Sequence, residues 1–356
     1  MTDPLSINGC PVVTLQADGD GPGVVRADIA PGRGMLLLQA RGRMEGVGEF
    51  DILHAPPPAE AARLLNAGAP DDFAGNLAFS FGGAILLPFA NRIRGRNLSG
   101  SREIETEVGG RTVRLPRNWG GKASGAEQYA MHGLILDTAP DDLHQPGPDR
   151  LRARLALGDF GGRWPSQTFA DIEWALEGRG LRLTVDVKNV GDDLLPMGVG
   201  WHPYFGLKSG DRRQARLRLP AHRRLLVSNY DEVLPTGETA PVGGTPYDFT
   251  SAQGAALDDL YLDDCFVDLS PASGRLTADV LDPAGGYGVR VTADAPPVRA
   301  VQVYAPPDKA FVVLEPQLNW PDPFGAEWAG AETGMAMLQP GESLTYGATL
   351  ELCAPA

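Results

Sequence analysis

Glycine and proline interrupt this chain along its whole length. The 356 residues include 45 glycines and 31 prolines, about a fifth of the chain, against roughly 12% in an average protein. Because proline breaks helices and glycine weakens them, a helical bundle, a coiled coil and a long helical solenoid are excluded. Hydrophobic residues make up 43% of the sequence and occur throughout it. The sequence therefore predicts a packed protein of many short strands joined by turns.

Residues 181–188 carry the clearest strand pattern, since apolar and polar side chains alternate there. The apolar positions are Leu181, Leu183, Val185 and Val187. We expect further strands at 298–304, at 311–314 (ended by Pro316) and at 344–352, with turns at 235–237, 282–286 and 306–308. The best helix candidate is 59–66, with Gly68 after its end. No repeat or linker divides the chain. We predict an all-β, mainly antiparallel sandwich or barrel with few short helices.

The charge balance excludes two kinds of partner. The net charge is −14, from 31 Lys and Arg against 45 Asp and Glu. Nucleic acids and anionic membranes both bind clustered positive charge, so we expect neither as a partner. The three cysteines (Cys10, Cys265 and Cys353) form no CxxC pair, and an odd number makes a poor disulfide framework. With no signal peptide evident and no apolar run long enough to cross a bilayer, we expect a cytoplasmic protein.

Motifs of several large enzyme classes are absent from the sequence. It contains no GxGxxG dinucleotide turn, GxxxxGK[ST] phosphate loop, GxSxG nucleophile elbow or HExxH zinc helix. The histidines are widely separated, and their spacing predicts no metal site; they are His54, His132, His144, His202 and His222. We therefore expect neither a nucleotide cofactor nor a metal.

One candidate for proton transfer is His202, in the segment Gly-Trp-His-Pro-Tyr-Phe at 200–205. It lies between aromatic residues and directly before Pro203, which favours an extended backbone. With an ordinary pKa of ~6.5, an imidazole can donate a proton near neutral pH. The alternative is a structural histidine that is hydrogen-bonded in the core.

A second candidate is Glu315, which follows four apolar residues and directly precedes Pro316. A carboxylate at the end of a buried strand is costly unless it is paired or functional. Burial there would raise its pKa and make it a stronger base. The alternatives are a glutamate that faces solvent and one side of a structural ion pair.

Other polar residues stand in apolar surroundings. Arg92 can grip hydroxyls or a carboxylate with its planar guanidinium, or it can be an ion-paired surface arginine. His132 is either a second polar contact or a turn histidine. Two acidic pairs, Asp258-Asp259 and Asp263-Asp264, can accept hydrogen bonds from sugar hydroxyls or bind Ca²⁺, although the spacing is not that of an EF-hand. Gln302 interrupts an apolar strand, and the pattern leaves open which side it faces.

Seven short segments, taken in order, resemble the aldose 1-epimerase (galactose mutarotase) family. They are LLPFANRI (86–93), HG (132–133), HPYF (202–205), LPTG (234–237), LDDCF (262–266), VQVY (301–304) and LEPQLNWPD (314–322). HPYF with a downstream LEPQ is the most specific pairing, whereas the first 80 or so residues match poorly. Two positions depart from many relatives, which carry a basic or aromatic residue where Leu134 follows the HG pair and a histidine where Asp264 follows Asp263.

The resemblance implies a large antiparallel β-sandwich in one domain over residues 1–356. It implies an isomerase that needs no cofactor and interconverts the α and β anomers of a free aldohexose such as galactose or glucose. Glu315 would be the general base and His202 the general acid. The residues implied to bind the sugar are Asn91, Arg92, His132, Asp263 and Gln302. The preferred aldose, the choice between Asp263 and Asp264 as the sugar ligand, and the oligomeric state, monomer or homodimer, stay open.

Under this resemblance the chemistry is a ring opening. Glu315 would take a proton from the anomeric hydroxyl while His202 gives one to the ring oxygen. Rotation about the bond between the first two carbons exposes the other carbonyl face, and reclosure reverses both transfers. His132 would add a hydrogen bond near the ring oxygen.

Three other functions compete with this one. A hexose-phosphate 1-epimerase would need a cationic phosphate clamp, for which Arg94, Arg96 and Arg102 are candidates. A non-catalytic carbohydrate-binding protein would lack Glu315 or His202, and both are present. A glycoside hydrolase would need a second carboxylate in a setting equivalent to that of Glu315.

Overall fold

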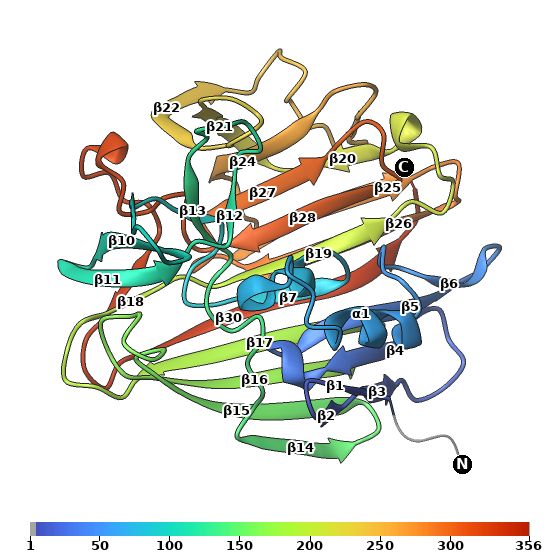
Figure 1. The fold of residues 1–356 in the computed structure, drawn as a ribbon. Helices are drawn as coiled ribbons and strands as arrows, with labels where there is room; N and C mark the ends of the chain where they lie inside the picture. The colour runs from blue at the N-terminus through green and yellow to red at the C-terminus, as the bar shows by residue number, and fades with distance from the viewer. Residues whose placement is uncertain (1–4, 356) are drawn as a thin grey trace.

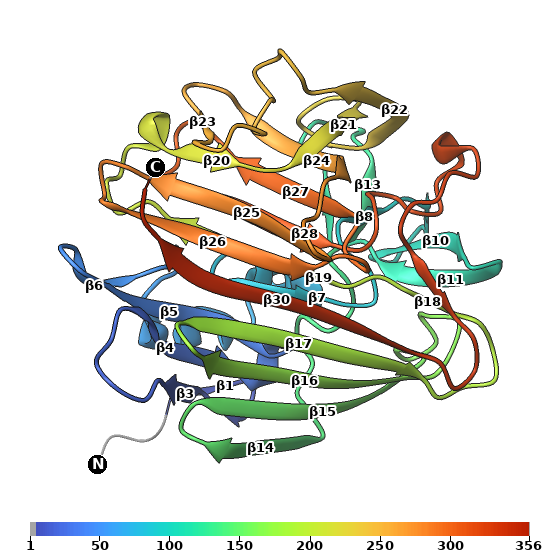
Figure 2. The same ribbon diagram turned by 180° about the vertical axis from the view of Figure 1, so that it is seen from behind.

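Two large antiparallel sheets make up most of the structure, a computed structural model that describes residues 5–355 (Figures 1 and 2). The first sheet has nine strands. In spatial order they are β14 (Asp142–Gly147), β15 (Arg150–Gly158), β16 (Thr168–Glu177), β17 (Gly180–Asn189), β30 (Ser343–Cys353), β26 (Tyr287–Asp294), β25 (Arg275–Asp282), β20 (Arg216–Arg218) and β23 (Ala255–Ala256). Its centre is β30, which pairs with β17 on one side and β26 on the other.

The second sheet has eleven strands and carries most of the segments singled out in the sequence. In spatial order these are β22 (Pro235–Pro241), β21 (Ala221–Val227), β24 (Leu262–Leu269), β27 (Ala300–Ala305), β28 (Phe311–Gln317), β19 (Gly200–Gly206), β7 (Gly83–Leu86), β5 (Leu36–Met44), β4 (Gly23–Ala30) and β3 (Val13–Gln16), with β6 (Gly48–Asp51) paired to β5.

Smaller elements lie outside these two sheets. The short strands are β1 (Ser6–Ile7), β2 (Cys10–Pro11), β8 (Arg92–Ile93), β9 (Arg96–Asn97), β10 (Glu103–Val108), β11 (Arg111–Pro116), β12 (Trp119–Gly120), β13 (Gln128–Met131), β18 (Leu195–Met197) and β29 (Ala336–Leu338). The helices are α1 (Pro58–Leu65) and the 3₁₀ turns η1 (Pro31–Arg33), η2 (Phe73–Phe79), η3 (Arg212–Gln214) and η4 (Ala326–Trp328). No helix within residues 5–355 has the length and apolar character needed to cross a membrane.

The main hydrophobic core contains side chains from both large sheets. Because side chains alternate along a strand, every second residue of the eleven-stranded sheet faces this core. On β28, Val312 and Leu314 face it, and on β19, Trp201 and Phe205 do. The residues between them point to the opposite, outer face. A second apolar cluster on that face includes residues of α1, η2 and β7.

The predicted antiparallel β-sandwich is confirmed. The alternating segment 181–188 is β17, with its apolar side chains buried, and the segments at 298–304, 344–352 and 59–66 correspond to β27, β30 and α1. The predicted turns at 282–286 and 306–308 connect β25 to β26 and β27 to β28.

Two sequence predictions about proline are wrong. The residues at 235–237 begin strand β22 rather than forming a turn, because a proline in the first position of a strand need not donate a ladder hydrogen bond. Pro316 does not end its strand either, since β28 continues to Gln317. Pro203 of the neighbouring strand β19 also lacks an N–H group. Both missing donors therefore fall in one stretch of the pairing between β19 and β28.

Candidate active site

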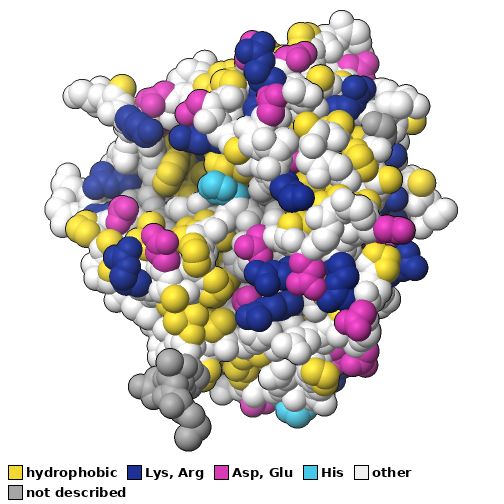
Figure 3. All heavy atoms as spheres, turned by 90° about the vertical axis from the view of Figure 1, so that its right-hand side faces the viewer, with side chains coloured by type: hydrophobic (Ala, Val, Ile, Leu, Met, Phe, Trp, Pro, Cys, Tyr) yellow, Lys and Arg dark blue, Asp and Glu magenta, His cyan; other side chains and the backbone are white. Residues whose placement is uncertain are grey.

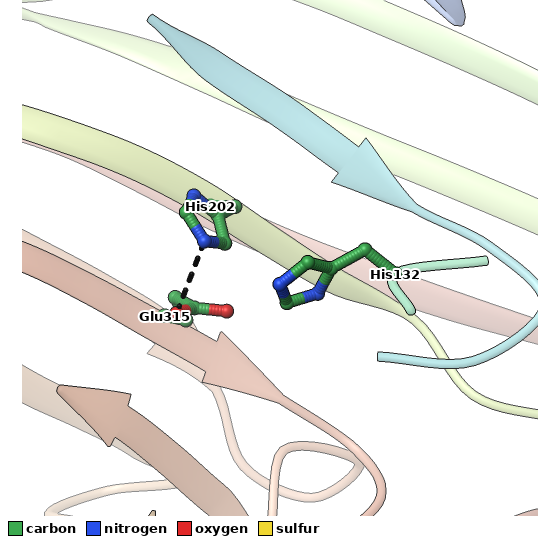
Figure 4. A group of neighbouring side chains, drawn as sticks. All are labelled: His132, His202 and Glu315. Atoms are coloured by element: carbon green, nitrogen blue, oxygen red, sulfur yellow. Dashed lines mark ion pairs between the residues drawn. The ribbon is translucent and has the colours of Figure 1, made fainter. Parts of the chain in front are cut away.

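The register of two neighbouring strands places His202 opposite Glu315. Gly200 faces Gln317 and Tyr204 faces Val313 in the antiparallel pair β19–β28, and the same register sets residue 202 against residue 315. Both side chains point to the outer face of the sheet, and they are 4% and 1% exposed. His202 Nε2 lies 3.4 Å from Glu315 Oε1 (Figure 4). The two candidates for proton transfer are therefore direct neighbours.

The next strands add Gln302 and Asp263 to the same face. Gln302 on β27 is opposite Glu315 on one side and Cys265 of β24 on the other. Asp263 precedes Cys265 by two residues, so it turns to the same face. Gln302 Nε2 donates a hydrogen bond to Asp263 Oδ1 at 2.6 Å. Gln302 thus faces the cavity, which settles the side that the sequence left open.

Asn91 and Arg92 complete a closed hydrogen-bonded ring with these two side chains. The Arg92 guanidinium donates to Asn91 Oδ1 at 2.6 Å and to Asp263 Oδ2 at 3.4 Å. Asn91 Nδ2 donates to Gln302 Oε1 at 3.0 Å. Asn91 has a φ of 63°, a left-handed conformation that asparagine tolerates better than most residues. Because each member is held by two others, the polar groups around the cavity are fixed in orientation.

His132 reaches the same place from the end of β13. Its backbone is left-handed, with a φ of 59°, and its N–H donates to the Asn91 carbonyl at 2.8 Å. Its ring meets the His202 ring edge-on, with the centroids 4.7 Å apart. Figure 4 shows the two histidines approaching Glu315 from different sides. All seven site residues predicted from the sequence therefore lie around one cavity.

That cavity has a volume of about 310 Å³, and the face drawn in Figure 3 is hollowed, with hydrophobic side chains and a histidine at the hollow. Aromatic side chains that sequence reasoning missed also line the cavity; they are Phe79, Trp119, Tyr204, Tyr230, Tyr261, Tyr304 and Phe311. Tyr204 and Tyr304 follow His202 and Gln302 by two residues, so strand alternation could have found them. Trp119 and Tyr230 lie on other segments and carry no such signal. A larger hollow of about 530 Å³ over β15 and β16 is lined by arginines paired with carboxylates.

Burial favours the uncharged forms of Glu315, His202 and His132. It raises the pKa of Glu315 well above its ordinary value, and the Asp263 carboxylate raises it further. Burial also lowers the pKa of His202 to about 3. The pKa of His132 is lowered well below its usual value, first by burial and then by His202 and Arg92. Both histidines are therefore neutral in the free protein.

The two adjacent aspartates have different surroundings. Asp263 lines the cavity, whereas Asp264 is fully buried and pairs with Arg224. The Tyr230 hydroxyl donates to Asp264 Oδ2 at 3.0 Å. Strand alternation explains this division, because neighbouring residues of β24 point to opposite faces.

The arginines considered for a phosphate clamp do not line the cavity. Arg94 pairs with Asp322 and Glu327, and Arg96 pairs with Glu105. The Arg102 guanidinium lies over a phenylalanine ring. Their charges are thus engaged elsewhere.

One group of side chains has the donor atoms of a metal site. One ligand atom each from His132, His202 and Glu315 lies within 4.8 Å of the other two. Two imidazoles and a carboxylate are a set that Zn²⁺ accepts. The spacing of the histidines in the sequence gave no sign of this, because strand pairing and a loop bring them together.

Comparison with known proteins places this arrangement in a family. The aldose 1-epimerase family model matches residues 56–351. Among solved structures, the chain is similar to a galactose mutarotase-like protein from Clostridium acetobutylicum, with a TM-score of 0.71 and 18% identity over 94% of both chains.

Two other solved structures have the same fold. An aldose epimerase homologue from C. elegans gives a TM-score of 0.71 at 16% identity, covering 97% of this chain and 99% of that one. Galactose 1-epimerase from Lactobacillus acidophilus gives 0.64 at 17%, covering 97% and 99%. No curated protein matches the sequence at a significant level. Because the family model spans most of the sequence, the chain belongs to the aldose 1-epimerase family.

Proposed function

We propose that this protein is an aldose 1-epimerase that interconverts the α and β anomers of a free aldohexose such as galactose or glucose. Glu315 is the general base, which takes the proton of the anomeric hydroxyl. His202 is the general acid, which protonates the ring oxygen. The observation that carries the proposal is the buried contact of 3.4 Å between His202 Nε2 and Glu315 Oε1 at the cavity wall.

The short distance between Glu315 and His202 suits the opening of a hemiacetal ring. The anomeric hydroxyl and the ring oxygen are bonded to the same carbon, so one acid and one base must reach two neighbouring oxygens. Glycosidases instead separate their two carboxyl groups by about 5–5.5 Å or by about 6.5–9.5 Å. Asp263 is a second carboxylate in the cavity, but Gln302 and Arg92 already engage it. The geometry therefore favours ring opening over glycoside cleavage.

The pKa shifts indicate which of the two groups, Glu315 or His202, carries a proton before the reaction. Because burial raises the pKa of Glu315 and lowers that of His202, a proton bound by the pair rests on the carboxyl group rather than on the imidazole. Moving that proton from the carboxyl group to the imidazole leaves a carboxylate base beside an imidazolium acid, with no change in net charge. Each of the two groups contributes ~10²–10⁴-fold to the rate.

The remaining side chains position the sugar. Asn91, Arg92, Asp263 and Gln302 form a ring of donors and acceptors that is set before the sugar binds, so little ordering is needed on binding. His132 lies beside His202, where it hydrogen-bonds near the ring oxygen. No cofactor takes part in this scheme, since both proton transfers use side chains of the protein.

The test is the rate of mutarotation of freshly dissolved α-D-galactose and α-D-glucose, followed by polarimetry or by proton NMR of the anomeric signals. We expect the protein to accelerate the approach to equilibrium and Glu315→Gln to abolish the acceleration. Glu332→Gln is the matched control, because that side chain is 91% exposed. Turnover close to wild type in Glu315→Gln would exclude Glu315 as the base.

Two further substrates separate the competing functions. Glucose 6-phosphate in the same assay tests a sugar-phosphate epimerase, which the positions of Arg94, Arg96 and Arg102 disfavour. An aryl glycoside tests a glycoside hydrolase, which would release the aryl alcohol. Sugar binding without acceleration of any aldose would indicate a carbohydrate-binding protein.

A further inference from the structure

The cavity has an outer part that the proposed reaction does not use. Within residues 5–355, the exposed large hydrophobic side chains are Trp119, Val190, Tyr230 and Met337. Two of them, Trp119 at 41% exposed and Tyr230 at 39%, line this one cavity. Tyr261 lies against Tyr230, with the ring centroids 5.0 Å apart. We call Trp119, Tyr230 and Tyr261 the aromatic rim.

Contacts with buried residues hold the aromatic rim in place. The Tyr230 hydroxyl donates to the buried carboxylate of Asp264, which Arg224 neutralises. The Trp119 ring packs edge-on against Phe79, with the centroids 5.5 Å apart, and Phe79 in turn contacts His132. Tyr230 therefore has a fixed hydroxyl and Trp119 a packed edge, although both rings keep much of their surface exposed.

The two segments that carry the aromatic rim are also tied to each other. The Lys122 N–H donates to Asp231 Oδ2 at 3.1 Å, and the Glu127 N–H donates to Glu232 Oε1 at 2.7 Å. The Tyr129 hydroxyl donates to the Glu232 carbonyl at 2.7 Å. Because these groups are ordered before any ligand arrives, a ligand that covers the rim need not order it.

We propose that the aromatic rim is a second sugar subsite and that the preferred substrate is a reducing disaccharide. Its hemiacetal ring lies in the deep polar part of the cavity against Glu315 and His202, and its second ring covers Trp119 and Tyr230. This inference rests on the proposed function, because only a ring with a free anomeric hydroxyl can open.

The chemistry of the rim fits a sugar ring joined through a hydroxyl distant from the anomeric carbon. A pyranose has C–H faces that pack on aromatic rings and hydroxyls at its edge. The exposed faces of Trp119 and Tyr230 supply apolar area whose burial is favourable. Lys122 and Asp231, which also line this part of the cavity, are polar partners for the edge hydroxyls.

The test compares sugars that share the same reducing ring: glucose, maltose and cellobiose. We expect wild-type kcat/KM for at least one disaccharide to equal or exceed that for glucose. In Trp119→Ala, the ratio of disaccharide to glucose kcat/KM should fall about tenfold, mainly through KM. The matched control is Met337→Ala, which removes an equally exposed side chain away from the cavity and should leave the ratio unchanged.

A binding measurement makes the test independent of turnover. Methyl β-cellobioside and methyl β-glucoside cannot open, so both should inhibit competitively, and Trp119→Ala should weaken inhibition by the disaccharide more than inhibition by the monosaccharide. A ratio that changes less than about twofold in Trp119→Ala, with glucose turnover intact, would overturn the subsite and leave the epimerase standing. Acceleration of no free sugar at all would overturn the proposed function, and the subsite with it.

Discussion

At the scale of single residues, one physical cause acts on both reacting groups. Removal from water disfavours charge, so it raises the pKa of Glu315 and lowers that of His202. The sequence predicted the direction of the Glu315 shift but not the lowered pKa of His202, because it does not show how deeply the imidazole is buried. The sequence did indicate the residue types, since a glutamate after four apolar residues and a histidine among aromatic residues are both exceptions to their surroundings.

The identity of the acid is testable by substitution. His202→Asn should lower kcat for mutarotation by ~10²-fold or more, because asparagine keeps a hydrogen bond but has no proton to give. His132→Asn should have a smaller effect. Both are measured by polarimetry at saturating sugar. If His132→Asn had the larger effect, the roles of the two histidines would be exchanged.

A second residue-scale prediction concerns pH and stability. The pKa of His132 is depressed in the folded protein and is ~6.5 in the unfolded chain. The unfolded state then binds one more proton below pH ~6.5, so the histidine's contribution to stability is present above that pH and is lost as pH falls. The free energy of unfolding of wild type should decrease between about pH 6 and 5 more steeply than that of His132→Asn, by about 1.4 kcal/mol per pH unit.

Urea titrations at several pH values check this difference between the two proteins. Comparing slopes removes the contributions of all other groups, such as Glu315, whose raised pKa acts in the opposite direction. Parallel pH profiles would mean that His132 is charged in the folded protein.

At the scale of elements, the site is formed by three neighbouring strands and a loop. His202, Glu315 and Gln302 face one another across β19, β28 and β27 because the register of those strands is continuous. Strand alternation could be predicted from the sequence, but the register could not, since it depends on which strands become neighbours. The strand register does not place Asn91 and His132. Left-handed backbone conformations bring these two residues to the cavity.

Gly133 tests how the loop positions His132. Its φ is +84°, and a Cβ there would lie 2.3 Å from the Leu87 carbonyl oxygen. Gly133→Ala should therefore displace the segment, lower the free energy of unfolding by about 2–4 kcal/mol and reduce kcat.

The control for this variant is Gly125→Ala, which has a φ of +81° and nothing within 4 Å of the new Cβ. This variant has the backbone strain without the clash, so its free energy of unfolding should fall by about 1 kcal/mol. Urea midpoints of both variants give the comparison. Equal losses would show that the contact with Leu87 has no role.

At the scale of the whole molecule, both large sheets contribute to a single core. One contiguous cluster runs from Leu15 on β3 to Leu350 on β30 and includes residues of nearly every large strand. Glycine, proline and alternation are local signals, and they predicted an antiparallel sandwich or barrel, of which the family resemblance implied the sandwich. The sequence did not predict which strands form which sheet, because that depends on contacts between residues far apart in the chain.

This shared core predicts that the chain unfolds as one unit, as the expectation of a single domain requires. Urea unfolding followed by far-UV circular dichroism and by tryptophan fluorescence should give coincident transitions. Trp174 and Trp201, which pack against each other in the core, come from different sheets and report on both. Two separated transitions would indicate two domains.

The place of β30 has a consequence for synthesis on the ribosome. It is the last strand of its sheet to be made, yet it lies between β17 and β26 (Figure 2). After β17 emerges, roughly 150 more residues must be translated before β30 begins, which takes on the order of 10–30 s at an elongation rate of about 5–20 residues/s. During that interval the edge of β17 has no native neighbour, and an unpaired edge invites pairing with other chains. Folding yield in the cell should therefore depend on how β17 is shielded while the nascent chain is still incomplete.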